Sequence, residues 1–192
     1  VDDYADWATS YLNGKVPDLS NREVFLLGHS HGGRISIKIA ASGGIPLSHL
    51  YLCAAAGIRH KRHIKRIIGL IMAKSGKTLL SIPGLKALKP IGKKLMYNIV
   101  RVHDYEKASE TMRKTLVNVS AEDLRPLLKD IKVKTDIFWG KQDGMTPFSD
   151  AKIVEEEIAD STLHSYPETR HAVHKDQAKD IAKTIITRVK QD

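Results

Sequence analysis

Hydrophobic residues recur with helical spacing at the start of the chain. They follow one another at intervals of three and four and so share one face of a helix: Tyr4, Trp7, Ala8, Tyr11 and Leu12. The polar stretch NGKVPDLSNR comes next and is typical of a loop. EVFLLG, at 23–28, is a short apolar run with polar flanks, which predicts a buried strand.

The segment after this strand is ambiguous by pattern alone. Residues 33–41 alternate between apolar and polar side chains, which a strand would also do. We interpret them as a helix because the run at 47–55 is the better strand, and because SGGIP supplies a glycine stop between the two. Residues 59–132 then show helical patterns and short proline- and glycine-broken pieces, with no convincing strand.

The last third of the chain returns to alternating elements. Strands are predicted at 134–140 and 161–167, and helices at about 149–158 and 176–190. Such alternation predicts the α/β class, with a mostly parallel sheet of about four strands and helices on both faces.

The expected domain organisation follows from the interruption in this pattern. Residues 1–58 and 133–192 form the predicted α/β core, and 59–132 form a helical insertion. The chain begins with Val1 rather than Met, directly in a helical pattern, so we expect it to be a fragment or a processed product.

Charge and composition restrict the possible partners. The net charge of +9 is concentrated in the insertion, where residues 59–103 hold 12 Lys and Arg and no acidic residue. This block is either a solvated basic surface or a contact for anionic membranes. The sequence has no zinc-ligand spacing, RNA-binding aromatic pattern or helix-turn-helix signature, so neither a metal nor nucleic acid is expected. Cys53 is the single cysteine, which favours a reducing compartment, and a cytoplasmic location is expected.

The sequence GHSHGG contains the strongest chemical signal. Ser30 lies between Gly28 and Gly32 in a G-x-S-x-G pattern that leaves a predicted strand and enters a predicted helix. In that context the turn is strained and bulky flanking residues would collide, so both glycines are expected to be required. The alternative is a structural turn that needs small residues only.

A serine nucleophile needs a base and a group that orients the base. Asp143 follows the predicted strand 134–140, and His171 follows the strand 161–167, so both lie where α/β sheets place their sites. Asp143 could instead be a turn residue. His174 and His164 compete with His171 for the role of base, and we favour His171. His29 and His31 flank Ser30 too closely to act as its base and are expected to line a pocket or pack.

Together, GHSHGG, the pattern W-G-x-x-D-x-x-x-P that ends at Pro147, and the histidine loop resemble the serine-nucleophile branch of the α/β-hydrolase family with a helical cap. The resemblance implies that Ser30 is the nucleophile, His171 the general base and acid, and Asp143 its orienting partner. The backbone N–H of His31 would be half of the oxyanion hole, and residues 59–132 would be the cap. No cofactor is implied, and the substrate would be a small acyl compound.

The sequence departs from the family pattern in two places. Arg170 and Asp176 stand where the family usually has a glycine before and a glutamate after the histidine. Only 22 residues precede EVFLLG, whereas the family normally has about four more strands there, one of which leads to the second oxyanion donor. We therefore expect the carboxyl-terminal part of a longer hydrolase, with strand 23–28 at an exposed sheet edge.

The expected activity is hydrolysis of a carboxylic ester or similar acyl substrate. Hydrolysis of a carbon–carbon bond by the same three residues is the alternative within the family. A catalytically incomplete fragment that acts as a binding module is the alternative outside it.

Overall fold

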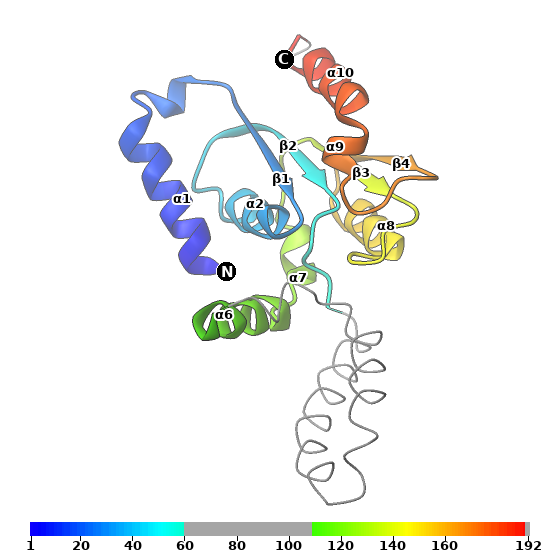
Figure 1. Ribbon diagram of the computed structural model, residues 1–192. Helices are drawn as coiled ribbons and strands as arrows, with labels where there is room; N and C mark the ends of the chain where they lie inside the picture. The colour runs from blue at the N-terminus through cyan, green and yellow to red at the C-terminus, as the bar shows by residue number, and fades with distance from the viewer. Residues whose placement is uncertain (60–108, 191–192) are drawn as a thin grey trace, which may run out of the picture. The chain divides into compact units, whose positions relative to one another are not determined.

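The computed structural model describes residues 1–59 and 109–190, which form parts of two compact units (Figure 1). One unit contains Val1–Ile58 and Glu122–Asp192, and the other contains Arg59–Ala121. In the second unit, helix α6 runs from Glu110 to Ala121, as its sequence pattern predicts. The expectations for the basic block at 59–103 and for a cap concern residues that, apart from Arg59, lie outside the described part of the insertion up to residue 108.

The first unit is built on four parallel strands. They are β1 (Val24–His29), β2 (Leu47–Cys53), β3 (Thr135–Gly140) and β4 (Ser161–Tyr166), and they lie side by side in chain order. All three pairings are parallel, as predicted. In the register, Gly28, Leu52, Ile137 and Leu163 form one row across the sheet.

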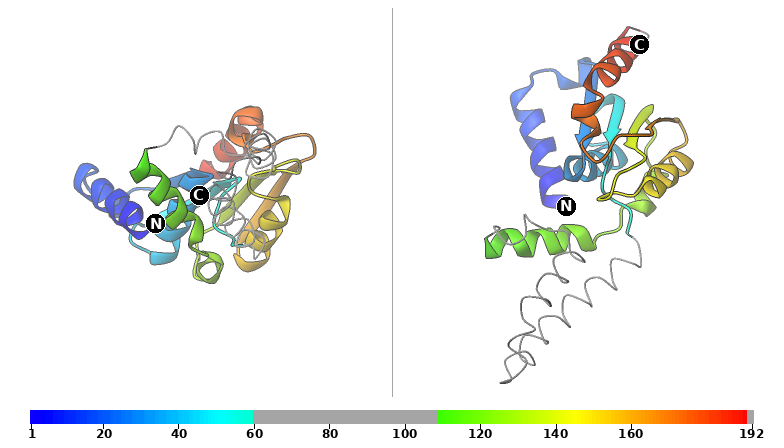
Figure 2. Two further views of the ribbon diagram at one scale, coloured as in Figure 1. Left: turned by 60° about the horizontal axis from the view of Figure 1, so that its bottom comes forward. Right: turned by 45° about the vertical axis from the view of Figure 1, so that its right-hand side comes forward.

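The residues of this row point to one face of the sheet, and their neighbours along each strand point to the other face. A Cβ on Gly28 would meet Ser36, so the row faces helix α2 (His31–Ser42). The residues one position away face α10 (Ala178–Val189), where Arg188 binds Asp136. In the left view of Figure 2, α2 and α8 (Phe148–Glu157) lie on one side of the strands and α10 lies on the other. The predicted helices on both faces are therefore present.

Shorter elements complete the unit. A 3₁₀ turn spans Leu19–Asn21, α7 spans Arg125–Leu128, and α9 spans Val173–Asp176 immediately before α10. The predicted closing helix is thus divided at Gln177. The main hydrophobic core lies around the two central strands, where Tyr51, Phe138 and Trp139 are completely buried. Among the described residues, no helix is both long and apolar enough to cross a membrane.

Helix α1 (Asp2–Lys15) forms as predicted but buries a different side of its apolar face. Ala5, Ala8 and Leu12 pack into a second, smaller core cluster. Trp7 is 66% exposed, and its ring stacks on Tyr11 with 5.3 Å between the ring centroids. The rings of Trp7 and Tyr11 thus lie outside this cluster.

The first strand occupies an edge of the described sheet, as expected from the sequence. Among the described strands, β1 pairs with β2 alone, and Leu27 in β1 is 43% exposed. The carboxyl end of this edge strand leads directly into Ser30.

Candidate active site

The turn that carries Ser30 is strained, as the elbow pattern predicts. Strand β1 ends at His29, helix α2 begins at His31, and Ser30 between them has φ 52° and ψ −113°. Such a positive φ costs a non-glycine residue on the order of 1–3 kcal/mol. The end of β2 holds this backbone in place, because the Ser30 N–H donates to the Cys53 carbonyl at 3.1 Å and its carbonyl accepts from Ala56 at 3.0 Å.

Two glycines allow the elbow to pack, but they are not the two that the sequence indicated. A Cβ on Gly28 would lie 2.7 Å from the Gly32 carbonyl oxygen, so Gly28 is required as expected. A Cβ on Gly32 would meet nothing within 4 Å among the described residues, so the steric argument for Gly32 was wrong. The second required glycine is Gly33, where a Cβ would lie 2.5 Å from the Cβ of Ala55. Close packing of α2 against the chain after β2 imposes this requirement, and the motif alone does not show it.

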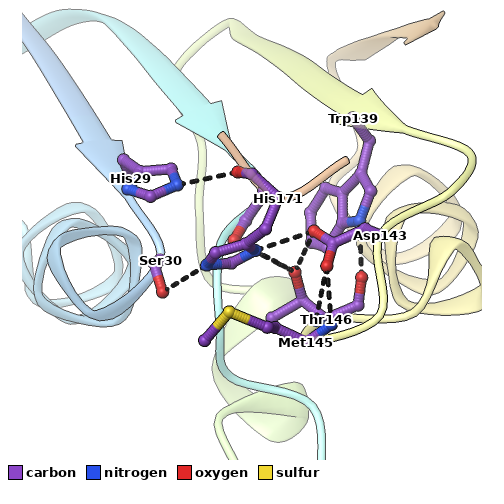
Figure 3. Close-up of polar contacts among 8 residues, drawn as sticks. His29, Ser30, Trp139, Asp143, Met145, Thr146 and His171 are labelled. Atoms are coloured by element: carbon purple, nitrogen blue, oxygen red, sulfur yellow. Dashed lines mark hydrogen bonds and ion pairs between the residues drawn. The ribbon is translucent and has the colours of Figure 1, made fainter. Parts of the chain in front are cut away.

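Three residues from distant parts of the sequence form a continuous hydrogen-bond chain (Figure 3). Ser30 Oγ lies 2.9 Å from His171 Nε2, and His171 Nδ1 lies 2.8 Å from Asp143 Oδ2. Asp143 follows β3, and His171 lies between β4 and α9, so the chain spans the carboxyl ends of three strands. This is the edge at which α/β sheets place their sites.

The competing histidines lie elsewhere. His164 points to the α10 face of the sheet and donates to Asp136 at 2.7 Å. The His174 ring lies against the His29 ring in a tilted arrangement, with 3.8 Å between ring centroids. Its buried Nδ1 has no hydrogen-bond partner among the described residues. Of the three histidines, the structure thus brings His171 to Ser30.

The surroundings of Asp143 keep its carboxyl group ionised. Burial alone would raise the pKa, but hydrogen bonds from His171, Thr146 and two backbone N–H groups lower it below its usual value. An ionised carboxylate only accepts hydrogen bonds, so His171 Nδ1 carries the hydrogen in this pair. Nε2 of the neutral ring is then free to accept the Ser30 hydroxyl hydrogen.

Thr146 is a site residue that sequence reasoning missed. Its Oγ1 donates to Asp143 Oδ2 at 2.8 Å and lies 3.3 Å from His171 Nδ1. The N–H groups of Met145 and Thr146 also donate to Asp143 Oδ1, at 2.8 and 3.0 Å, which forms an Asx turn. The Thr146 carbonyl in turn accepts from the buried Trp139 indole at 3.0 Å. The signal in the sequence was a threonine three positions after the aspartate.

His29 was expected to line a pocket or pack, and it has a more specific contact. Its Nε2 lies 3.0 Å from the backbone carbonyl oxygen of His171 (Figure 3). Burial lowers the pKa of His29. The sequence gives no signal for this contact, which joins residues 142 positions apart.

His31, whose backbone N–H the resemblance assigns to the oxyanion hole, is the first residue of helix α2. Its backbone N–H belongs to the positive end of the helix, which favours negative charge. Its ring packs edge-to-face with Tyr4, with 5.4 Å between centroids. Burial lowers the pKa of the His31 imidazole.

Two further features of the described residues concern metal ligands and the single cysteine. These residues contain no group of three or more His, Cys, Asp or Glu side chains placed to bind a metal ion. Cys53 is buried, and burial raises the pKa of its thiol to about 12, so it is a poor nucleophile at neutral pH.

A parallel α/β sheet with a strained serine elbow and this hydrogen-bond chain defines the α/β hydrolases, and the comparisons with known proteins agree. The chain matches the family described as serine aminopeptidase, S33, over residues 1–178, and it belongs to that family of α/β-hydrolase enzymes. The resemblance inferred from the sequence and the predicted fold class are thereby confirmed.

Relatives and solved structures support the same assignment. The chain is 25% identical to the uncharacterized hydrolase YugF of Bacillus subtilis (strain 168), over 92% of this chain and 69% of YugF. It superposes on an esterase from Exiguobacterium antarcticum with a TM-score of 0.66 and 25% identity, covering 97% of this chain and 74% of the esterase. A meta-cleavage product hydrolase from Pseudomonas fluorescens IP01 is 16% identical, with a TM-score of 0.59 and coverage of 97% and 72%, and shares the fold.

Proposed function

We propose that the protein hydrolyses carboxylic esters or similar acyl compounds through an acyl-enzyme formed on Ser30. The observation that carries this proposal is the unbroken hydrogen-bond chain from Ser30 Oγ through the His171 ring to the buried Asp143 carboxylate. A serine hydroxyl reacts with carbonyl compounds only when an adjacent base removes its proton, and this chain supplies that base.

In the first half of the reaction, Ser30 Oγ attacks the substrate carbonyl carbon while its proton moves to His171 Nε2. The Asp143 carboxylate faces the resulting imidazolium and stabilises its charge. The substrate oxygen becomes an oxyanion, and the His31 N–H at the start of α2 is one donor that stabilises it. His171 then gives its proton to the leaving alcohol oxygen as the carbon–oxygen bond breaks.

The second half repeats these steps with water. His171 accepts a proton from a water molecule, the hydroxide oxygen attacks the acyl carbon, and the bond to Ser30 Oγ breaks. His171 returns the proton to Ser30, and the carboxylic acid leaves. Each residue ends in its starting protonation state.

An ester is favoured over the carbon–carbon alternative because the chain is more similar in sequence to an esterase than to a carbon–carbon bond hydrolase. The esterase from Exiguobacterium antarcticum shares 25% of its aligned residues with the chain. The meta-cleavage product hydrolase is 16% identical, which supports the common fold alone. The proposed contact of the basic segment with anionic membranes concerns residues outside those described.

The proposal is tested by steady-state hydrolysis of p-nitrophenyl esters with acyl chains of increasing length. We expect turnover with at least one chain length and its loss in Ser30→Ala, because Ser30 Oγ is the described hydroxyl oxygen that lies at His171 Nε2. Ser42→Ala is a matched control, since Ser42 bonds to the Ile39 carbonyl at the far end of α2. Hydrolysis that survives in Ser30→Ala would contradict the proposed role of Ser30.

A further inference from the structure

We infer that His29 is a positioning residue, which holds the His171 main chain against the serine elbow through its Nε2–H. The inference rests on the proposed function, because it assigns a role in presenting His171 to Ser30. It gives a task to a side chain that the mechanism above does not use.

The geometry of the contact settles which atom donates. His29 Nε2 lies 3.0 Å from the His171 carbonyl oxygen, and a carbonyl oxygen only accepts hydrogen bonds. Neutral His29 must therefore carry its hydrogen on Nε2. Because His29 immediately precedes Ser30, the elbow binds one residue of the histidine loop at two points: His29 reaches the His171 backbone, and Ser30 reaches the His171 ring.

The rest of the histidine loop is anchored to the aspartate side of the site. The Gln142 N–H, one residue before Asp143, donates to the Thr169 carbonyl at 3.1 Å. The side-chain amide of Gln177, at the start of α10, donates to Thr169 Oγ1 at 2.8 Å and braces the loop from its other side. The Asp143 carboxylate itself holds the His171 ring. The contacts from Gln142 and Asp143 tie the histidine loop to the aspartate loop, and neither of them reaches the serine elbow. The bond from His29 ties the His171 backbone to the elbow, in addition to the bond between Ser30 and the His171 ring.

A neutral histidine suits this place electrostatically. The rings of His29 and His171 lie 4.9 Å apart between centroids, so a permanent positive charge at position 29 would oppose formation of the His171 imidazolium. Burial lowers the pKa of His29, and burial likewise lowers the pKa of the neighbouring His174. Both rings are thus neutral at neutral pH, and His29 donates its hydrogen bond without adding charge.

The test compares two substitutions of His29 with one of its neighbour. His29→Leu removes the donor, whereas His29→Gln retains an N–H donor on a side chain of similar reach. His174→Leu removes a ring from the same cluster that does not bind the His171 backbone. The readouts are kcat and KM for a p-nitrophenyl ester and the rate constant of inactivation by a fluorophosphonate, with circular dichroism as the check of folding.

We expect His29→Leu to lower kcat and the inactivation rate about 10- to 100-fold with KM changed little, since small misplacements of a catalytic group have effects of this size. His29→Gln should recover most of the loss, and His174→Leu should stay within about threefold of the wild type. An unchanged kcat in His29→Leu, or a His29→Gln variant as impaired as His29→Leu, would overturn the inference.

A measurement on the unsubstituted chain covers the case in which His29→Leu does not fold. Long-range ¹H–¹⁵N spectra of the histidine rings distinguish the two neutral tautomers. The Nε2–H tautomer of His29 at neutral pH supports the inference, and the Nδ1–H tautomer contradicts it. The spectrum also separates this inference from the proposed function, because it reports the hydrogen bond even if the chain hydrolyses no ester.

Discussion

His171 donates its Nδ1–H to Asp143 across 2.8 Å, and the Asp143 side chain is fully buried at the end of β3. The pairing joins two loops that are 28 residues apart in the sequence. It sets the tautomer of the imidazole, and through the tautomer it determines which nitrogen faces Ser30.

Replacing the carboxylate by an amide tests this dependence. Asp143→Asn keeps the size of the side chain but can present an N–H to His171, which favours the wrong tautomer. We expect kcat for ester hydrolysis to fall on the order of 10⁴-fold while the fold is retained. Steady-state assays of ester hydrolysis measure kcat, and circular dichroism checks that the variant is folded. A loss of kcat smaller than tenfold would contradict the role of Asp143.

Thr146 is expected to support Asp143 rather than to react. Thr146→Val removes the hydroxyl that donates to Asp143 Oδ2 but keeps the shape of the side chain. We expect kcat to fall about tenfold, the equivalent of one hydrogen bond to a charged group of about 1.5 kcal/mol. Thr146→Ser retains the hydroxyl and should keep most of the activity. Equal activities in the two variants would show that the hydroxyl has no part in the site.

The glycines of the elbow should differ in their tolerance of a methyl group. Gly28→Ala and Gly33→Ala place a Cβ against the Gly32 backbone and against Ala55, and each should lower the free energy of unfolding by about 1–3 kcal/mol. Gly32→Ala meets no described neighbour, and we expect it to stay within about 0.5 kcal/mol of the wild type. Urea denaturation gives the free energy of unfolding of all three variants. A Gly32→Ala variant as unstable as Gly28→Ala would contradict the proposed steric difference between the two glycines.

A buried charge cluster on the α10 face should make stability depend on pH. The Asp136 carboxylate accepts from His49 and His164 at 2.8 and 2.7 Å, and from Arg188 at 2.9 Å. Burial opposes ionisation of Asp136, but the bonds from His164, Arg188 and His49 outweigh it and hold the pKa well below its usual value. The folded state therefore binds the Asp136 proton more weakly than the unfolded chain does.

The sign of the effect follows from this lowered pKa. The contribution of Asp136 to stability is complete above the unfolded pKa of about 3.9 and is lost as the pH falls further, toward the folded pKa. Asp136→Asn should lower the free energy of unfolding by about 3 kcal/mol at neutral pH, because Arg188 and two histidines lose a charged acceptor. Urea denaturation at pH 7 and below pH 4 should show this deficit shrinking in acid. A deficit that is independent of pH would show that the pKa of Asp136 is not lowered in the folded state.

The sequence predicted the strands well because their signals are local. The β3 and β4 runs are apolar segments between polar breakers, and their observed bounds, Thr135–Gly140 and Ser161–Tyr166, differ from the predicted ones by one residue at an end. The order of Ser30, Asp143 and His171 was likewise readable from motifs at strand ends.

The errors and omissions concern packing between distant segments. Whether Trp7 or Ala5 is buried depends on which side of α1 packs against α2, and the requirement for Gly33 rather than Gly32 depends on Ala55. The contact of His29 with the His171 backbone exists only after the sheet has assembled. No local pattern records such contacts.

The most direct test of the proposed nucleophile is covalent labelling by a fluorophosphonate, followed by intact-mass analysis and peptide mapping. The account predicts one added phosphonyl group on Ser30, no addition in Ser30→Ala, and a strongly reduced rate of addition in Asp143→Asn. Addition to a different residue, or undiminished labelling of Ser30→Ala, would contradict it.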